Sequence, residues 1–317
     1  MPKTSARTRT AVVLAALGLA ACANAPAAAQ QAPDATFDAR VARPARDGRA
    51  PRVVVDEAHH HFRTAGGRDR AFADLVAADG GRVAPGTAPF SAAALAGVDV
   101  LVISDALGHP EMADPAAERS AFTAAECDAA RDGVRAGGAR VRIADHAPLG
   151  AAARALADRF GVGMRNAYAF DATRAHGGRL GTIAFRPDAG LAERPPIVAG
   201  RDSSERLRRV VSFTGQSLAG PPQGTAILAL SERAVDPIVG FGQAGPHAPC
   251  EQARSAAGHA QAVAFGFGRG RVVVLREAAM LPAQGAGPRR APFGMNVPGL
   301  DNRPFALNEV RWLTRAL

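Results

Sequence analysis

The chain has 317 residues, and its 38 basic and 29 acidic side chains give a formal net charge of +9. The basic residues are scattered among acidic ones and aromatic residues make up only 5% of the sequence, which argues against a nucleic-acid-binding surface. The length fits one large domain rather than several small ones.

The first residues predict export. Basic residues precede an apolar run at 11–21, which is too short to cross a bilayer as a helix and has the layout of an export signal. The run ends in Leu-Ala-Ala-Cys, which resembles a bacterial lipoprotein signal and implies lipidation of Cys22 after cleavage. No aspartate follows Cys22, so we expect an outer-membrane lipoprotein that faces the periplasm. The alternative is an ordinary secretory signal cut near residues 27–29.

Residues 22–50 are mostly Ala, Pro, Gln, Arg and Asp and offer few large apolar side chains to bury. This composition predicts a flexible tether. The predicted organisation is therefore a signal peptide at 1–21, a tether at 22–50 and a single α/β domain at 51–317.

From residue 51 the apolar pattern alternates between strands and helices. Val53–Val55 is typical of a buried parallel strand, and it leads directly into Asp56-Glu57-Ala58-His59-His60-His61. The predicted elements are, in order, a strand at 53–55, a helix at 68–78, strands at 82–84 and 98–103, a helix opened by the capping box 123–126, a strand at 140–144 and a helix at 150–160. The alternation predicts a parallel sheet with helices on both faces, in which the strand at 98–103 is central and buried.

After about residue 168 the pattern becomes β-rich. Short strands such as 210–213 and 226–230 are separated by Gly/Pro loops, and the segments 261–267 and 271–276 predict a hairpin. The Gly-x-Gly-x-Gly run at 266–270 joins two strands, so it does not indicate a nucleotide-binding loop. Residues 302–317 predict an amphipathic closing helix.

Several segments resemble a family of exported bacterial proteins within the class I glutamine amidotransferase-like superfamily. The segments are 56–60, 122–123, 136–138, 143–146, 277–280 and 294–296, together with the closing helix. The resemblance covers most of residues 52–317 and implies a flavodoxin-like α/β fold, with a β-rich elaboration in the C-terminal half. It supplies no activity.

The nucleophile of the amidotransferases is missing. Those enzymes place a Cys on a tight turn after a central strand, whereas the corresponding strand end here, Ile143–Pro148, has no Cys, Ser or Thr. Cys127 falls in a helical pattern and Cys250 in a Pro/Gly-rich loop, so a thioester route is disfavoured. Their spacing indicates no disulfide framework, and whether they pair stays open.

Four predicted strands end in polar, ionisable residues, and the carboxyl ends of parallel strands meet at one edge of a sheet. We therefore expect at least four of Asp56, Glu57, His59, Asp105, Asp145, His146 and Glu277 to line a single cleft. The expected acid/base groups are His59, His146, Glu57, Asp145 and Glu277. The expected ligand-binding groups are Asp56, His60, Asp105 and Asn296.

Imidazole and carboxylate groups together form either a metal-free acid/base pair or a divalent-metal site. The spacings typical of metal sites are absent, so a metal is the weaker alternative. Structural roles also stay open: Asp56 and Asp145 can cap loops, Glu277 can pair with an Arg, and Asn296 lies in a connector. His60 or His61 can simply be exposed, because consecutive residues of an extended segment point to opposite sides.

Two classes of function remain. One is a non-catalytic module that binds a small cell-envelope ligand in the strand-end cleft, which the missing nucleophile favours. The other is a hydrolase-like enzyme, metal-assisted or not, which the density of carboxylate and His residues favours.

Overall fold

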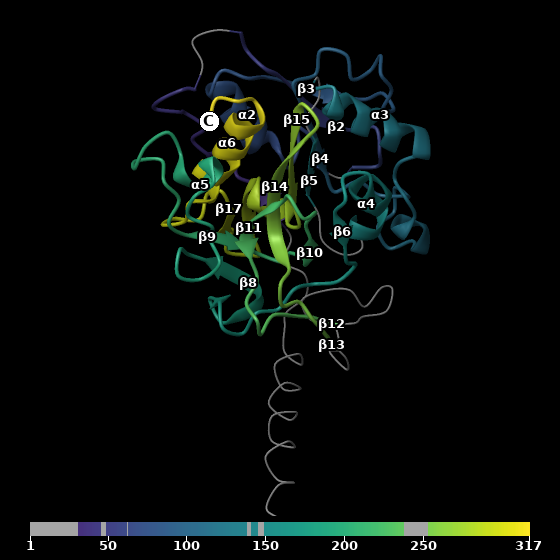
Figure 1. Ribbon diagram of the computed structural model, residues 1–317. Coiled ribbons are helices and arrows are strands. Elements are labelled where there is room, and N and C mark those ends of the chain that lie inside the picture. The colour runs from purple at the N-terminus through teal and green to yellow at the C-terminus, as the bar shows by residue number, and fades with distance from the viewer. Residues whose placement is uncertain (1–30, 46–48, 62, 138–140, 145–148, 238–252) are drawn as a thin grey trace, which may run out of the picture.

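Residues 31–45, 49–61, 63–137, 141–144, 149–237 and 253–317 are described in the computed structural model. The chain folds as a mixed α/β protein with one large sheet and several small ones (Figure 1). Within the described ranges, no helix has the length and apolar character that crossing a membrane requires.

The large sheet has the strand order β3-β2-β4-β5-β15-β14-β10-β6, with β11 paired to β14. Its strands are β2 (Arg52–Asp56), β3 (Arg82–Gly86), β4 (Val100–Ser104), β5 (Val141–Ala144), β6 (Gly163–Met164), β10 (Leu218–Ala219), β11 (Thr225–Ala229), β14 (Ala260–Phe267) and β15 (Gly270–Leu275). Neighbouring strands from β3 to β15 pair in parallel, and those from β15 to β6 pair antiparallel. The carboxyl ends of β2, β4, β5 and β15 therefore share one edge.

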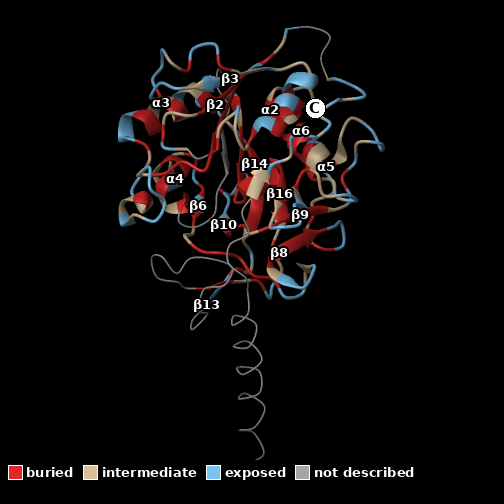
Figure 2. Cartoon of the chain, turned by 180° about the vertical axis from the view of Figure 1, so that it is seen from behind, coloured by how far each residue is buried: buried red, intermediate tan, exposed pale blue. Residues whose placement is uncertain are grey.

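Helices cover both faces of the sheet. The helices are α2 (Arg70–Ala78), α3 (Ala124–Arg135), α4 (Leu149–Asp158), α5 (Pro196–Ala199) and α6 (Asn302–Leu313). Val53 and Val55 pack toward α2, α5 and α6, whereas Val54 between them packs toward α3 and α4. Burial of alternate residues on opposite faces gives three layers, and the buried strands lie at their centre (Figure 2).

The prediction that the strand at 98–103 is central and buried is confirmed. All five residues of β4 are buried, and β4 pairs with β2 on one side and β5 on the other. The capping box is also confirmed: the Thr123 side chain accepts from the Glu126 amide while Glu126 bonds back to Thr123. The hairpin of β14 and β15 forms as predicted. The closing helix ends earlier than predicted, at Leu313, and Thr314 caps it.

The β-rich part consists of small antiparallel sheets. They contain β1 (Gln31–Pro33), β7 (Ala175–His176), β8 (Arg179–Phe185), β9 (Val210–Ser212), β12 (Val235–Pro237), β13 (Ala253–Ser255), β16 (Ala283–Ala286) and β17 (Ala291–Gly294). Two 3₁₀ turns complete the described elements, η2 (Pro115–Glu118) and η3 (Ala278–Met280).

The prediction of a flexible tether is wrong for residues 31–45. Strand β1 pairs antiparallel with β16, and Phe37 and Val41 pack against the core. The segment has few large apolar side chains, but its backbone groups can still pair with an open sheet edge. Composition alone does not reveal that kind of pairing.

Candidate functional site

Buried ionisable side chains gather at the edge where β2, β4 and β15 end. Asp56 is the last residue of β2, Asp105 directly follows β4, and Glu277 lies two residues beyond β15. Asp56, Asp105 and Glu277 are fully buried, and His59 is 6% exposed. Four predicted residues from three strand ends thus lie at one edge, in two clusters.

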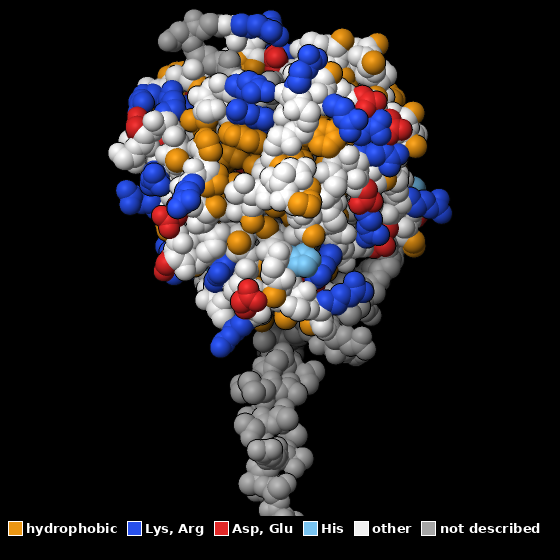
Figure 3. Space-filling model, viewed as in Figure 1, with side chains coloured by type: hydrophobic (Ala, Val, Ile, Leu, Met, Phe, Trp, Pro, Cys, Tyr) orange, Lys and Arg blue, Asp and Glu red, His pale blue; other side chains and the backbone are white. Residues whose placement is uncertain are grey.

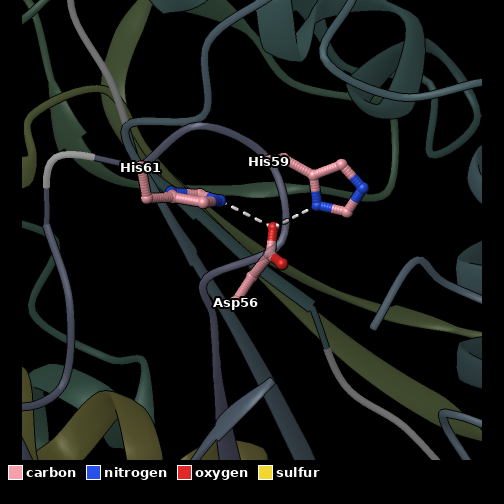
Figure 4. A group of neighbouring side chains, drawn as sticks. All are labelled: Asp56, His59 and His61. Carbon is pink, nitrogen blue, oxygen red and sulfur yellow. Dashed lines mark hydrogen bonds and ion pairs between the residues drawn. The ribbon is translucent and has the colours of Figure 1, made fainter. Parts of the chain in front are cut away.

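The first group, called here the histidine cluster, consists of Asp56, His59, His61 and Glu126. Asp56 Oδ2 lies 2.7 Å from His59 Nδ1 and 2.7 Å from His61 Nε2, so one carboxylate oxygen meets two rings (Figure 4). The outer nitrogen of His59, Nε2, lies 2.8 Å from Glu126 Oε1. The outer nitrogen of His61, Nδ1, contacts the backbone carbonyl of Ser104.

The loop after β2 holds both rings in place. Asp56 Oδ1 accepts a hydrogen bond from the Ala58 amide, and the His59 carbonyl accepts one from the Leu107 amide at 3.1 Å. His60 between the rings has a positive φ of 52° and is exposed, so the backbone turns there and both neighbours face inward. A non-glycine residue in this conformation is strained, and such strain is common at functional sites.

Aromatic rings fix the orientation of His59. Its imidazole packs against both Phe90 and Phe122, with ring centroids 4.7 and 4.6 Å away, and the two phenyl rings stack on each other at 5.4 Å. Glu126 on α3 is held equally firmly, because its Oε2 accepts from Thr123 and its Oε1 also accepts from the Phe90 amide. The capping box that opens α3 therefore also positions the partner of His59.

The electrostatics of the cluster favour charged forms. Burial alone lowers the pKa of His59, but Asp56 and Glu126 outweigh it and raise that pKa above the ordinary value. Burial likewise raises the pKa of Asp56, yet the bonds from His59 and His61 outweigh it and hold that pKa below its ordinary value. For Glu126, burial is outweighed by the Thr123 amide and His59, and the pKa is again lowered.

The second group, called here the arginine cluster, consists of Arg63, Asp69, Asp105 and Glu277. The buried Arg63 donates from Nε to Asp105 and approaches Asp69 at 3.5 Å. Burial lowers the pKa of Arg63, but Asp105, Asp69 and more weakly Glu277 outweigh it and raise that pKa. Glu277 also accepts from the Ala279 amide and Thr214, so the carboxylate caps η3.

The remaining predicted residues take other places. Glu57 accepts from the Ala65 amide at 2.8 Å and stabilises the loop. His60 is exposed and does not join the cluster, and the neighbouring His61 points inward and contacts Asp56 instead. Asn296 bonds Asp34, Gln284 and Phe293, and thereby anchors the N-terminal segment. Cys22, Asp145, His146 and Cys250 lie outside the described residues.

The sequence reasoning missed four members of the clusters: His61, Arg63, Asp69 and Glu126. His61 could not be chosen over His60, because that choice depends on the backbone conformation at residue 60. Glu126 was identified only as a helix cap. Arg63 could not be distinguished from the many other arginines of the chain.

Cys127 does not supply the missing nucleophile. It is fully buried in α3, and burial raises the pKa of its thiol. A buried thiol with a raised pKa is a poor nucleophile.

A cavity of about 460 Å³ lies near the carboxyl end of β15. Arg276, directly after β15, donates to the Arg165 carbonyl at 2.7 Å and so links the strand end to the cavity wall. The lining residues are Arg154, Met164, Arg165, Asn166, Ala167, Asp236, Pro237 and Arg254. Of the predicted site residues that the structure describes, Asn296 lines the second cavity, of about 410 Å³, and the others line neither cavity.

No protein-family model matches the sequence, and the search of curated proteins gives no match. Among solved structures, the N-terminal domain of mmIFT52 aligns with 83% of this chain and 97% of its own, at 13% identity and a TM-score of 0.53. A protein described as ThuA-like from Bacteroides uniformis aligns with 86% of this chain and 95% of its own, at 13% identity and a TM-score of 0.43. A cytoplasmic protein of Salmonella typhimurium aligns with 83% of this chain and 98% of its own, at 11% identity and a TM-score of 0.44. The first similarity shows a shared α/β fold and nothing of activity.

Proposed function

We propose that this chain is an exported, lipid-anchored module of the class I glutamine amidotransferase-like superfamily that binds a small acidic ligand of the cell envelope. The single observation that carries the ligand proposal is the arginine-lined cavity at the strand-end edge. Ligands of open α/β sheets bind beyond the carboxyl ends of the strands, which is where this cavity lies.

Strand order supports the proposed superfamily. In chain order the five parallel strands are β2, β3, β4, β5 and β15, and in space they run second, first, third, fourth, fifth. That order is the flavodoxin-like one. The chain between β5 and β15 contains helix α4 and then a β-rich insertion, and both contribute residues to the cavity wall.

The charge of the cavity supports an anionic ligand. Among the described lining residues, Arg154, Arg165 and Arg254 are accompanied by one carboxylate, Asp236, which pairs with Arg165 at 2.7 Å. Two arginines are thus left to face a ligand, and guanidinium groups bind carboxylates through paired hydrogen bonds. Elsewhere basic and acidic side chains lie interspersed, as on the face in Figure 3.

Calorimetric titration with N-acetylmuramic acid, compared with the uncharged N-acetylglucosamine, tests this ligand class. We expect only the carboxylate-bearing sugar to bind, and Arg254→Gln to weaken binding about tenfold through loss of a charge-assisted hydrogen bond. Arg194→Gln, at an exposed arginine outside the cavity, is the matched control. Equal binding of both sugars would contradict the proposal.

The anchoring is tested separately. Replacing Cys22 by Ser should abolish metabolic labelling with a fatty acid and release the protein from the membrane fraction, because the single lipid-bearing thiol is lost. Unchanged membrane association of Cys22→Ser would contradict the lipoprotein proposal.

A hydrolase-like activity is the second candidate. The observation that favours it is the histidine cluster, in which two imidazoles and two carboxylates are in direct hydrogen-bond contact. Such a group can serve as an acid/base pair or hold a cation.

A further inference from the structure

We propose that the histidine cluster is a mononuclear site for a divalent transition-metal cation, with His59 Nδ1, His61 Nε2 and Asp56 Oδ2 as the protein ligands. This inference is independent of the ligand proposed for the arginine-lined cavity. The three donor atoms lie within 4.8 Å of one another, and their side chains are almost fully buried (Figure 4).

Two neutral imidazoles carry one N–H each, which is too few for the four contacts that their ring nitrogens make with oxygen acceptors. The Ser104 carbonyl can only accept, so His61 must donate from Nδ1. A neutral His61 then presents the lone pair of Nε2 to Asp56 Oδ2 across 2.7 Å, where a proton or a cation is required. The histidine cluster needs one extra positive charge at this contact.

The same reasoning applies to His59. Its two nitrogens face the carboxylates of Asp56 and Glu126, and a neutral ring carries a single proton for two acceptors. The histidine cluster therefore needs two extra protons to satisfy its contacts. One divalent cation among the three donor atoms supplies the same charge and releases both protons.

The outer contacts match those of metal-binding histidines. Such a histidine donates its second ring N–H to a carboxylate or a backbone carbonyl, which fixes the tautomer and the ring. His59 has Glu126 in that role and His61 has the Ser104 carbonyl. Both partners are themselves fixed, Glu126 by the capping box and Ser104 as the last residue of β4.

The geometry requires little movement. Ligand bonds of about 2.1 Å at angles between 90° and tetrahedral place donor atoms about 3.0–3.4 Å apart. The two nitrogens now lie 2.7 Å from the carboxylate oxygen, so these contacts need to open by less than about 1 Å, while the two nitrogens, which lie within 4.8 Å of each other, need to approach by at most about 1.5 Å. Two imidazoles and one carboxylate suit zinc or ferrous iron rather than calcium or magnesium, and they leave a position for water.

The decisive experiment uses the full chain purified without a polyhistidine tag and stripped with EDTA. Zinc is then titrated against a chromophoric chelator. We expect a single equivalent to bind, and His61→Ala to weaken binding about 100-fold or more, since a ligand is removed. Glu126→Gln, which keeps an acceptor but loses the charge, should weaken it about tenfold.

His60→Gly is the matched control, because it removes the exposed ring between the two ligands and adopts the positive φ of this position without strain. Arg254→Gln, which alters the other proposed site, should also bind zinc as the unmodified chain does. Wild-type affinity in His61→Ala, or no stoichiometric binding by the folded unmodified chain, would overturn the metal proposal. Neither result depends on the outcome with N-acetylmuramic acid.

A second measurement needs no variant, and so it decides the matter if His61→Ala does not fold. X-ray absorption spectroscopy of the zinc-loaded unmodified chain identifies the ligand atoms. We expect a shell that contains two imidazole nitrogens and a carboxylate oxygen at about 2.0–2.2 Å. A shell without imidazole would mean that zinc binds elsewhere and would overturn the proposal.

Discussion

The histidine cluster and the arginine cluster lie at the same sheet edge and differ in what their protons can do. They meet at the end of β4, where the Ser104 carbonyl accepts from His61 and the next residue, Asp105, pairs with Arg63. A guanidinium never gives up its proton and has no lone pair for a metal. An imidazole exchanges its proton readily for a cation. The comparison indicates that the buried charges of the arginine cluster stabilise the fold, whereas those of the histidine cluster are suited to exchange protons for a cation.

Backbone geometry reinforces this division. His60 and Asp105, one in each loop, are the positive-φ non-glycine residues of the described edge, at 52° and 58°. The His59 carbonyl and the Leu107 amide bond the two loops together. Strain at both loops is compensated by the buried clusters that they carry. Removing either cluster should therefore affect stability, but for different reasons.

The largest effect is expected from breaking the arginine cluster. Arg63→Met removes the buried guanidinium that pairs with the buried Asp105 and Asp69, which should lower the free energy of unfolding by about 3–5 kcal/mol. Urea denaturation measures this. The control is Arg70→Met, whose pair with Asp74 is solvent-exposed and should contribute less than about 0.5 kcal/mol. Similar losses in both variants would remove the contrast between buried and exposed pairs.

Glu205, a second carboxylate bound by arginine, lies away from this edge. Its arginine partners stay protonated, so the pH response of the pair comes from the carboxylate alone. Hydrogen bonds from Arg201, aided by Arg311, lower the pKa of Glu205 from 4.5 to about 2. A lowered carboxylate pKa adds stability above the ordinary value, and this stability is lost as pH falls from about 4.5 toward 2. Glu205→Gln should remove that acid dependence, on the order of 3 kcal/mol, in denaturation curves at several pH values. An unchanged pH profile would show that Glu205 does not carry it.

Much of the sheet edge could be predicted from the sequence, because local signals define strand ends. The β-branched run before Asp56, the apolar run before Asp105 and the hairpin strand before Glu277 each fixed where a strand stops. Parallel pairing then brings those ends together without further information. These are the residues that the structure finds buried at one edge.

The choice between His60 and His61 could not be made in the same way. It depends on one backbone angle, the positive φ of His60, which the bonds of His59 and His61 impose after folding. Glu126 was hidden for a related reason, since its capping role is local and its bond to His59 spans 67 positions. Pairing of β1 with β16 is likewise a backbone contact between distant segments. Side-chain pattern predicts elements well and such long-range bonds poorly.

Zinc should stabilise the fold through the histidine cluster and not through the arginine cluster. A cation that binds the folded state alone stabilises it by about 2.7 kcal/mol at a concentration of 100 times its dissociation constant. We expect that gain in the unmodified chain and in Arg63→Met, if the latter still folds, and no gain in His61→Ala. Thermal unfolding with zinc, and after EDTA removes it, gives the measurement. A gain that persists in His61→Ala would place the cation outside the histidine cluster.

The smallest effect is expected at His60, and it distinguishes backbone geometry from ring chemistry. Glycine adopts a φ of 52° without strain but makes the unfolded chain more flexible, so His60→Gly should change stability by less than about 1 kcal/mol. Zinc affinity should be unchanged, because the His60 ring is exposed and contributes no ligand. His60→Val, whose branched side chain disfavours positive φ, should cost about 1–2 kcal/mol and weaken zinc binding by displacing His59 and His61. If His60→Gly instead lost zinc, the exposed ring would be a ligand, and the cation would bind at the loop surface rather than inside the buried cluster.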